Sequence, residues 1–179
     1  LVIAALLIGG AFAYADLTPD VRAGIGDGSR VSSTGDVAVL AGTDHDAQTE
    51  VFSLSVGGLA GGLSLARAKI DGALAATAGG QISADNVTIV AGHNVDPATL
   101  QAIHQVRGGA IRGAFATAEA PVKGIATASA SLATAISSPD ATAAINAGAM
   151  LSAPGTVTVR ADGINQSRAT GRSIGVSLV

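Results

Sequence analysis

The chain has 179 residues, with ten lysines and arginines against thirteen aspartates and glutamates, and this balance excludes the basic face that a nucleic-acid-binding protein needs. Cysteine is absent, which excludes disulfides, zinc–thiolate sites and thiol nucleophiles. Hydrophobic residues make up 48% but aromatic residues only 2%, so the chain is too apolar for a disordered tail and too poor in bulky side chains for an ordinary globular core.

The first segment, Leu1–Tyr14, is the most hydrophobic stretch, and three interpretations compete for it. It is shorter than the roughly 20 apolar residues that cross a bilayer. Small residues before Asp16 are typical of the cleavage site of a secretory signal. The segment could instead be the apolar helix of a pilin-like subunit in a filament core. The third interpretation, a strand pair that bends at Gly9 and Gly10, is favoured by the repeat described next.

One motif occurs three times, over residues 25–39, 77–89 and 145–159. Each copy has a turn of glycine or other small residues, a short segment with one large apolar residue (Val31, Ile82 or Leu151), a polar turn and an alternating strand. Apolar residues two positions apart share one face of a strand, so these strands predict a thin apolar core. We call one turn of the predicted coil a rung. The predicted core positions of the rungs are Val37, Val39, Val87, Ile89, Val157 and Val159.

The stretch between the first two copies predicts a hairpin. Apolar residues alternate with serines from Phe52 to Val56, glycines follow at 57–62, and Leu63 and Leu65 begin a returning strand. Residues 125–136 alternate alanine with threonine or serine and predict a similar element, although the helix propensity of alanine leaves a helix open there.

Residues 96–112 have no counterpart in the first copy. We interpret them as an insertion that projects from the repeats, begins at Asp96–Pro97 and is helical in its first part.

The two ends of the sequence resemble the two halves of the predicted hairpin. Residues 173–179 match its first half, and the apolar N-terminus matches its second half. The chain therefore begins and ends in the middle of a repeat, which predicts open strand edges that favour head-to-tail association. The predicted assembly edges are Leu1, Val2, Ile3, Leu6, Leu7, Ile174, Val176 and Leu178.

The run from Ile25 to Asp44, IGDGSRVSSTGDVAVLAGTD, resembles the repeats of large secreted bacterial adhesins and autotransporter passenger domains of the filamentous-haemagglutinin type. The second and third copies have drifted from this pattern. The resemblance implies an exported, extended parallel β-helix that acts in adhesion, biofilm or fibre formation.

No catalytic or metal-binding constellation is predicted. His45 lies between Asp44 and Asp46, but alternating side chains of one strand point to opposite faces, so a solvated turn is favoured over a metal site. His93 and His104 lack a carboxylate or nucleophile at a defined spacing. We expect no cofactor, no metal and no enzymatic activity.

The sequence as a whole predicts an all-β fold, an elongated parallel β-helix (β-solenoid) with hairpin extensions and a short helical insertion. Residues 1–179 form one solenoid segment of about three degenerate repeats. We expect an extracellular structural or adhesive element at the cell surface or in a secreted fibre. Its expected partners are other copies of itself, adjoining repeats of a longer chain, surface glycans or host cells. The alternative is the pilin-like filament subunit.

Overall fold

The computed structural model describes residues 6–99, 101 and 112–177, and these residues form strands and no helix. The predicted all-β class with parallel sheets is confirmed. In chain order the strands are β1 (Leu6–Leu17), β2 (Asp20–Ile25), β3 (Arg30–Ser32), β4 (Val37–Thr43), β5 (Ala47–Phe52), β6 (Ser55–Ile70), β7 (Ala73–Ala78), β8 (Gln81–Ser83), β9 (Val87–His93), β10 (Ala114–Ser137), β11 (Asp140–Ile145), β12 (Met150–Ser152), β13 (Val157–Gly163) and β14 (Ser167–Ser177).

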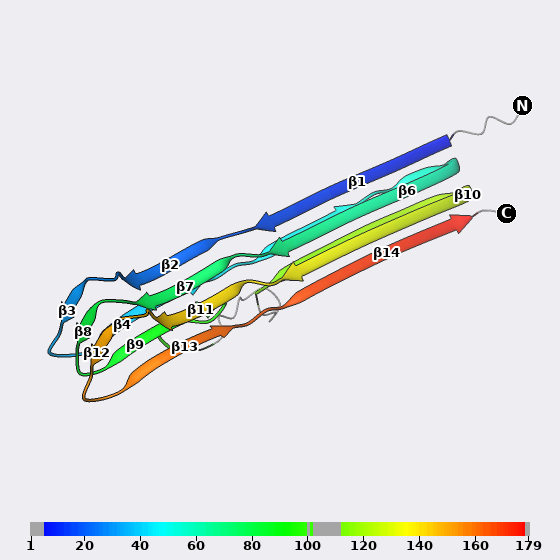
Figure 1. The fold of residues 1–179 in the computed structure, drawn as a ribbon. Coiled ribbons are helices and arrows are strands. Elements are labelled where there is room, and N and C mark those ends of the chain that lie inside the picture. Colours follow the sequence, from blue (N-terminus) through cyan, green and yellow to red (C-terminus); the bar gives the residue numbers. More distant parts are fainter. Residues whose placement is uncertain (1–5, 100, 102–111, 178–179) are drawn as a thin grey trace, which may run out of the picture.

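Every strand pair is parallel, and the strands form four sheets. The longest sheet has the order β1-β6-β10-β14, with β5 also paired to β10. The other three sheets are β2-β7-β11, β3-β8-β12 and β4-β9-β13. The chain visits these sheets three times, and we call each visit a pass. Each pass places its strands beside the corresponding strands of the preceding pass (Figure 1).

The register shows where the passes differ in length. Thr43 pairs with His93, 50 residues later, whereas Ala47 pairs with Ala114, 67 residues later. The second pass therefore contains 67 − 50 = 17 more residues than the first between these points. The predicted insertion at 96–112 falls in this interval. Residues 97–99 form a turn, whereas residues 100 and 102–111, which include His104, lie outside the described residues, so the predicted helical part is not tested there.

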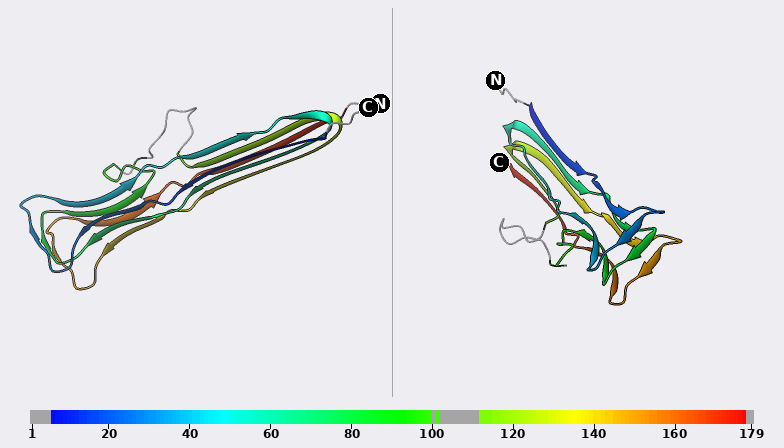
Figure 2. Two further views of the ribbon diagram at one scale, coloured as in Figure 1. Left: turned by 90° about the horizontal axis from the view of Figure 1, so that it is seen from above. Right: turned by 90° about the vertical axis from the view of Figure 1, so that its left-hand side faces the viewer.

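The molecule has a wide end and a long, thin arm (Figures 1 and 2). The three short sheets surround the core of the wide end, and the long sheet forms the arm. The core of the wide end consists of aliphatic side chains, namely Val39, Ala41, Leu74, Ala76, Ala78, Ile82, Ala84, Val87, Ile89 and Ala91. The arm has two layers with a second core of mainly alanine, which permits the layers to approach closely.

The predicted hairpin is wrong in its pairing. The chain does reverse direction at the tip of the arm. β5 runs toward the tip, and the part of β6 from Leu59 onward runs back from it (Figure 2). The strands on either side of the reversal do not pair with each other, since β5 pairs with β10 whereas β6 pairs with β1 and β10. They face each other through side chains, and their hydrogen bonds run to neighbouring passes of the chain.

Small side chains fill the space between the two layers of the arm. The hydroxyl groups of Ser53 and Ser64 lie 2.8 Å apart, and Ser64 donates to the carbonyl oxygen of Glu119 at 2.6 Å. A Cβ atom at Gly62 would lie only 2.8 Å from Cγ2 of Val122 in the opposite layer. The close approach of the layers thus explains why glycine, alanine and serine dominate the arm.

Two segments that the sequence left ambiguous are strands. Residues 125–136 belong to β10, so the helix alternative is wrong there. Residues Leu6–Tyr14 belong to β1, and the helical interpretation required by a pilin-like subunit is wrong for them. The predicted strand pair with a bend at Gly9 and Gly10 is also wrong, because β1 pairs with β6 without interruption through both glycines. The physical reason is the same in both cases, because each segment completes a backbone ladder with β6.

Candidate functional site

The structure offers two candidate sites, the open strand edges at the ends of the sheets and a buried polar junction beside the insertion. In the wide end, the central strands β7, β8 and β9 are paired on both sides. Their neighbours are paired on one side only within this chain: β2, β3 and β4 at one end, and β11, β12 and β13 at the other. We call these the first edge and the last edge.

The six predicted core positions form two rows across the sheet β4-β9-β13, each row made of residues that are in register on the three strands. Val37, Val87 and Val157 are in register, and so are Val39, Ile89 and Val159. In the central strand Val87 and Ile89 are 0% exposed, whereas Val157 and Val159 in the last strand are 44% and 42% exposed. Val39 on the first strand, β4, is also buried at 6% exposed, so in this sheet it is the last edge that leaves its valines uncovered.

The backbone groups of the two edges are complementary. The amide of Val37 donates to the carbonyl of Asn86 at 2.9 Å, and the amide of Asn94 donates to Thr43 at 2.8 Å. Because successive residues of a strand direct their backbone groups to opposite sides, the amide of Ala38 points out of the first edge. At the other end Val87 donates to Thr156 at 2.9 Å, so the backbone groups of Val157 point out of the last edge.

The residues predicted as assembly edges lie at opposite ends of the long sheet. Leu6 and Leu7 on β1 are 67% and 46% exposed, and Ile174 and Val176 on β14 are 37% and 45% exposed. The structure does not bring these two groups together, since β6 and β10 separate β1 from β14. Leu1, Val2, Ile3 and Leu178 lie outside the described residues.

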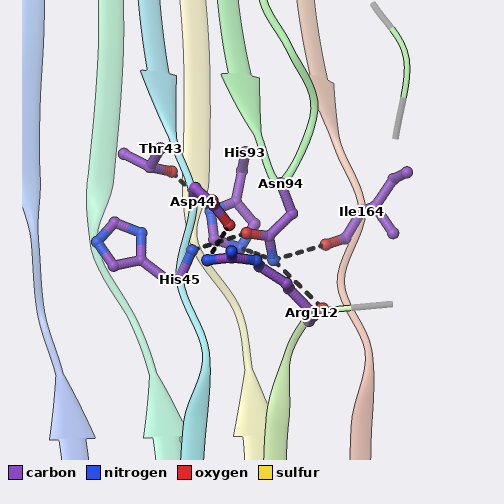
Figure 3. Close-up of polar contacts among 7 residues, drawn as sticks. All are labelled: Thr43, Asp44, His45, His93, Asn94, Arg112 and Ile164. Atoms are coloured by element: carbon purple, nitrogen blue, oxygen red, sulfur yellow. Dashed lines mark hydrogen bonds and ion pairs between the residues drawn. The ribbon is translucent and has the colours of Figure 1, made fainter. Parts of the chain in front are cut away.

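The second candidate site is a polar junction around His93 and Asn94, at the point where the strands β4, β9 and β13 end (Figure 3). His93, at the end of β9, and the following Asn94 are fully buried. Asn94 has a positive φ of 54°, a conformation that asparagine adopts more readily than most residues. This turn aims the Asn94 side chain across three successive passes of the chain.

The hydrogen bonds of Asn94 define the proton position on His93. The backbone amide of His45 donates to Oδ1 of Asn94 at 2.9 Å, so Nδ2 of Asn94 faces Nε2 of His93 at 3.1 Å. Nε2 must therefore accept, and the imidazole proton lies on Nδ1, which donates to Oγ1 of Thr43 at 2.9 Å. The neutral form of His93 is the one that satisfies both contacts.

Burial favours this neutral form further. The pKa of His93 is lowered to about 4, first by loss of solvation and second by the nearby His45 ring. The two rings are stacked, with centroids 6.1 Å apart. Protonation would place an N–H group against the Asn94 amide donor, so the junction disfavours the charged form on geometric grounds as well.

The junction also ties in Arg112, the last residue of the predicted insertion, and the third pass. Nδ2 of Asn94 lies 3.3 Å from the carbonyl oxygen of Arg112 and 3.4 Å from that of Ile164. The guanidinium of Arg112 forms an ion pair with Asp44 (Figure 3). The predicted solvated turn at 44–46 is thus partly engaged, because Asp44 is paired and His45 stacks against His93. The junction is suited to hold passes of unequal length together.

The sequence indicated the histidines but not this role. Asn94 was missed altogether, and the only local signal for it is its position directly after β9, where a strand ends and a long insertion follows. In the described part of the chain, no group of three or more histidine, aspartate or glutamate side chains is placed to hold a metal ion.

No family model, curated protein or solved structure matches this chain. Among the residues with described structure, no helix is long and apolar enough to span a membrane.

Proposed function

We propose that this chain is a segment of a parallel β-solenoid and acts as a self-stacking structural element of an extracellular fibre. Copies, or adjoining repeats of a longer chain, join head to tail by continuing the strand ladders. The fibre extends away from the cell that carries it and acts in adhesion. Its surface contacts glycans or host cells.

The observation that carries this proposal is the match between the first and last edges. Both edges belong to the same three sheets, and the strands run in the same direction in every pass. A further copy could therefore set its β2, β3 and β4 against β11, β12 and β13 of this chain and continue each sheet. The long sheet offers the same continuation, with β1 of the next copy beside the returning half of β10.

Energetics favour such stacking. Val157 and Val159 are more than 40% exposed at the last edge, whereas their counterparts in the middle rung are fully buried. Covering each of these valines contributes roughly 1 kcal/mol, and each backbone pair at the edge adds a hydrogen bond of about 1 kcal/mol. Repeat architectures are stabilised by such nearest-neighbour interfaces because one rung alone cannot bury its apolar face.

The extracellular setting and the adhesive role rest on the resemblance of residues 25–44 to secreted adhesin repeats. The composition agrees with that resemblance, because small residues, few aromatic side chains and no cysteine suit a thin extended rod. A structural role also suits a molecule in which the buried His93 and Asn94 hold passes of the chain together.

The test is a proline at the first edge. Ala38 directs its amide away from β9, so Ala38→Pro removes an edge donor without removing an internal hydrogen bond. Ala38→Val keeps the amide and is the matched control. Sedimentation velocity over a concentration series should show large assemblies for the wild type and for Ala38→Val, and monomers for Ala38→Pro.

The proline variant should also act as a chain terminator. Its last edge is intact, so a substoichiometric amount added to wild-type protein can cap assemblies and shorten them. Far-ultraviolet circular dichroism and the melting temperature of the diluted protein check that the variant is folded. Assemblies of unchanged size in the pure variant, or a wild type that stays monomeric at every concentration, would overturn the proposal.

A further inference from the structure

The outer surface of the arm contains an apolar area on three adjacent strands. Segments Leu6–Phe12 of β1, Leu59–Leu65 of β6 and Ala126–Leu132 of β10 lie side by side in register. Every second residue of each segment, beginning with its first, faces outward, and all of these are glycine, alanine or larger apolar residues. Phe12 is 58% exposed and Leu132 is 60% exposed. We call this area the apolar face.

The polar side chains of the same segments point into the arm. Ser64 is 0% exposed and bonds to Ser53 of the opposite layer. Ser131 bonds to Ser173 and Thr127 bonds to Ser177, again across the arm. A sheet with one face in water normally directs apolar side chains inward and polar ones outward. The reversed pattern indicates that the apolar face is covered by something less polar than water.

The apolar face has a defined boundary toward the wide end. The next outward residues after it are Tyr14 and Arg67, and Arg67 lies 3.7 Å from Asp16. Seven residues along the strands and three strands across give a flat area of about 330 Å², from spacings of roughly 3.3 and 4.8 Å. A stable interface buries about 800 Å² on each partner, so one copy alone is too small to hold a partner.

Stacking removes this limit. Each further copy in a head-to-tail rod extends the apolar face along the rod, so three stacked copies present about 1,000 Å², above the roughly 800 Å² per partner that a stable interface needs. A strip that grows with rod length suits an occupant that grows in the same way. A second rod of the same chain has that property and offers an identical flat surface.

The opposite surface of the arm argues against lipid as the occupant. Its outward residues combine the charged Glu119, Lys123 and Arg172 with exposed apolar side chains, namely Phe52, Leu54, Val56, Ile174 and Val176. Charges at these positions make immersion of the whole arm in a bilayer costly. The outward residues of the apolar face include no charged side chain, whereas those of the opposite surface do, so a flat partner fits the apolar face better, at the roughly 10 Å spacing of packed sheets.

We propose that the apolar face is a lateral interface through which two stacked rods of this chain pair, apolar face against apolar face. This inference rests on the head-to-tail stacking proposed above and adds a second, perpendicular contact. The pairing is cooperative, because rods of one or two copies present too little area to hold together.

The experiment measures the mass per length of assemblies by scanning transmission electron microscopy. A copy of 17.2 kDa that contributes three strands to each stack of the wide end occupies about 14 Å, from a strand spacing of about 4.8 Å. A single rod thus has about 12 kDa per nm and a paired rod about 24 kDa per nm, by the same strand spacing. Leu63→Lys, in the middle strand of the apolar face, should convert paired rods into single rods of undiminished length.

The matched control is Phe52→Lys, which puts the same charge at a 59% exposed position on the opposite surface of the arm. It should leave rods paired, and melting temperatures of both variants check that they fold.

Single wild-type rods, or a Leu63→Lys variant that stays paired, would overturn lateral pairing while leaving stacking intact. Wild-type rods that are single and float with phosphatidylcholine vesicles would assign the apolar face to lipid instead. Absence of rods would overturn the stacking proposal and this one with it.

Discussion

Truncation of a central rung should cost far more stability than truncation of its counterpart at the last edge. Ile89 is 0% exposed and lies between Val39 and Val159 in register. Ile89→Ala removes three carbon atoms, worth about 2.4 kcal/mol at about 0.8 kcal/mol each. The cavity left in a rigid stack adds to this, so we expect a loss of about 3 kcal/mol or more in the free energy of unfolding.

Val159 provides the comparison, because it is paired in register with Ile89 on the last strand of the same sheet. It is 42% exposed, so Val159→Ala removes two half-covered carbon atoms and leaves no closed cavity. The expected loss is about 1 kcal/mol, again from about 0.8 kcal/mol per fully buried carbon. The measurement is urea unfolding followed by far-ultraviolet circular dichroism, at a concentration where the protein is monomeric.

Equal losses for the two variants would refute the reasoning that the last edge leaves Val159 uncovered while the central strand buries Ile89. Stacking of copies would have a different signature. The loss of unfolding free energy caused by Val159→Ala would then rise with protein concentration, whereas the loss caused by Ile89→Ala would stay constant. The reason is that a neighbouring copy covers position 159 and leaves position 89 as it was.

Two further predictions concern the polar junction and the arm. Because the pKa of His93 is lowered to about 4 in the folded protein, the unfolded chain binds more protons as the pH falls below about 6.5. The free energy of unfolding should therefore decrease by about 2 kcal/mol between pH 7 and pH 4.5, allowing for solvent screening in so thin a molecule. Urea unfolding at both pH values checks this, and His93→Gln should show a clearly smaller decrease; an unchanged pH dependence in the variant would contradict it. In the arm, Gly62→Ala places a Cβ 2.8 Å from Val122 and should lose about 1–3 kcal/mol, whereas Gly61→Ala meets only ordinary contacts of 3.8 Å or more and should change by less than about 1 kcal/mol. Equal melting temperatures for these two glycine variants would show that the layers of the arm can separate to admit a methyl group.

Much of the strand structure is predictable from the sequence, because the two-residue alternation of β structure is a local property. Val87 and Ile89 are separated by one polar residue, and that spacing alone places both on one face of β9. The recurrence of a large apolar residue at positions 31, 82 and 151 indicates equivalent places in successive passes, and the register sets these three side by side. Alanine-rich residues 125–136 form a strand despite their helix propensity, because the alternation with threonine and serine suits a ladder.

The choice of pairing partner is not a local property, and here sequence reasoning failed. Residues 52–56 and 63–65 have the pattern of a hairpin, but the same alternation serves equally well for two layers that each pair with another pass. Glycine and serine between the layers allow face-to-face packing, and the full-length ladders along β10 then supply more hydrogen bonds than one hairpin could. The outcome depends on strands that are 53 to 67 residues distant in the chain.

The polar junction and the apolar face depend on tertiary structure in the same way. Asn94 looks like an ordinary loop residue until three passes of the chain converge on its side chain. The alternation around Leu63 shows that apolar and small polar residues face opposite ways, but only the second layer of the arm decides which of them is inside. The sequence by itself determines period and composition, whereas which face is buried and which strands meet follow from contacts between passes far apart in the chain.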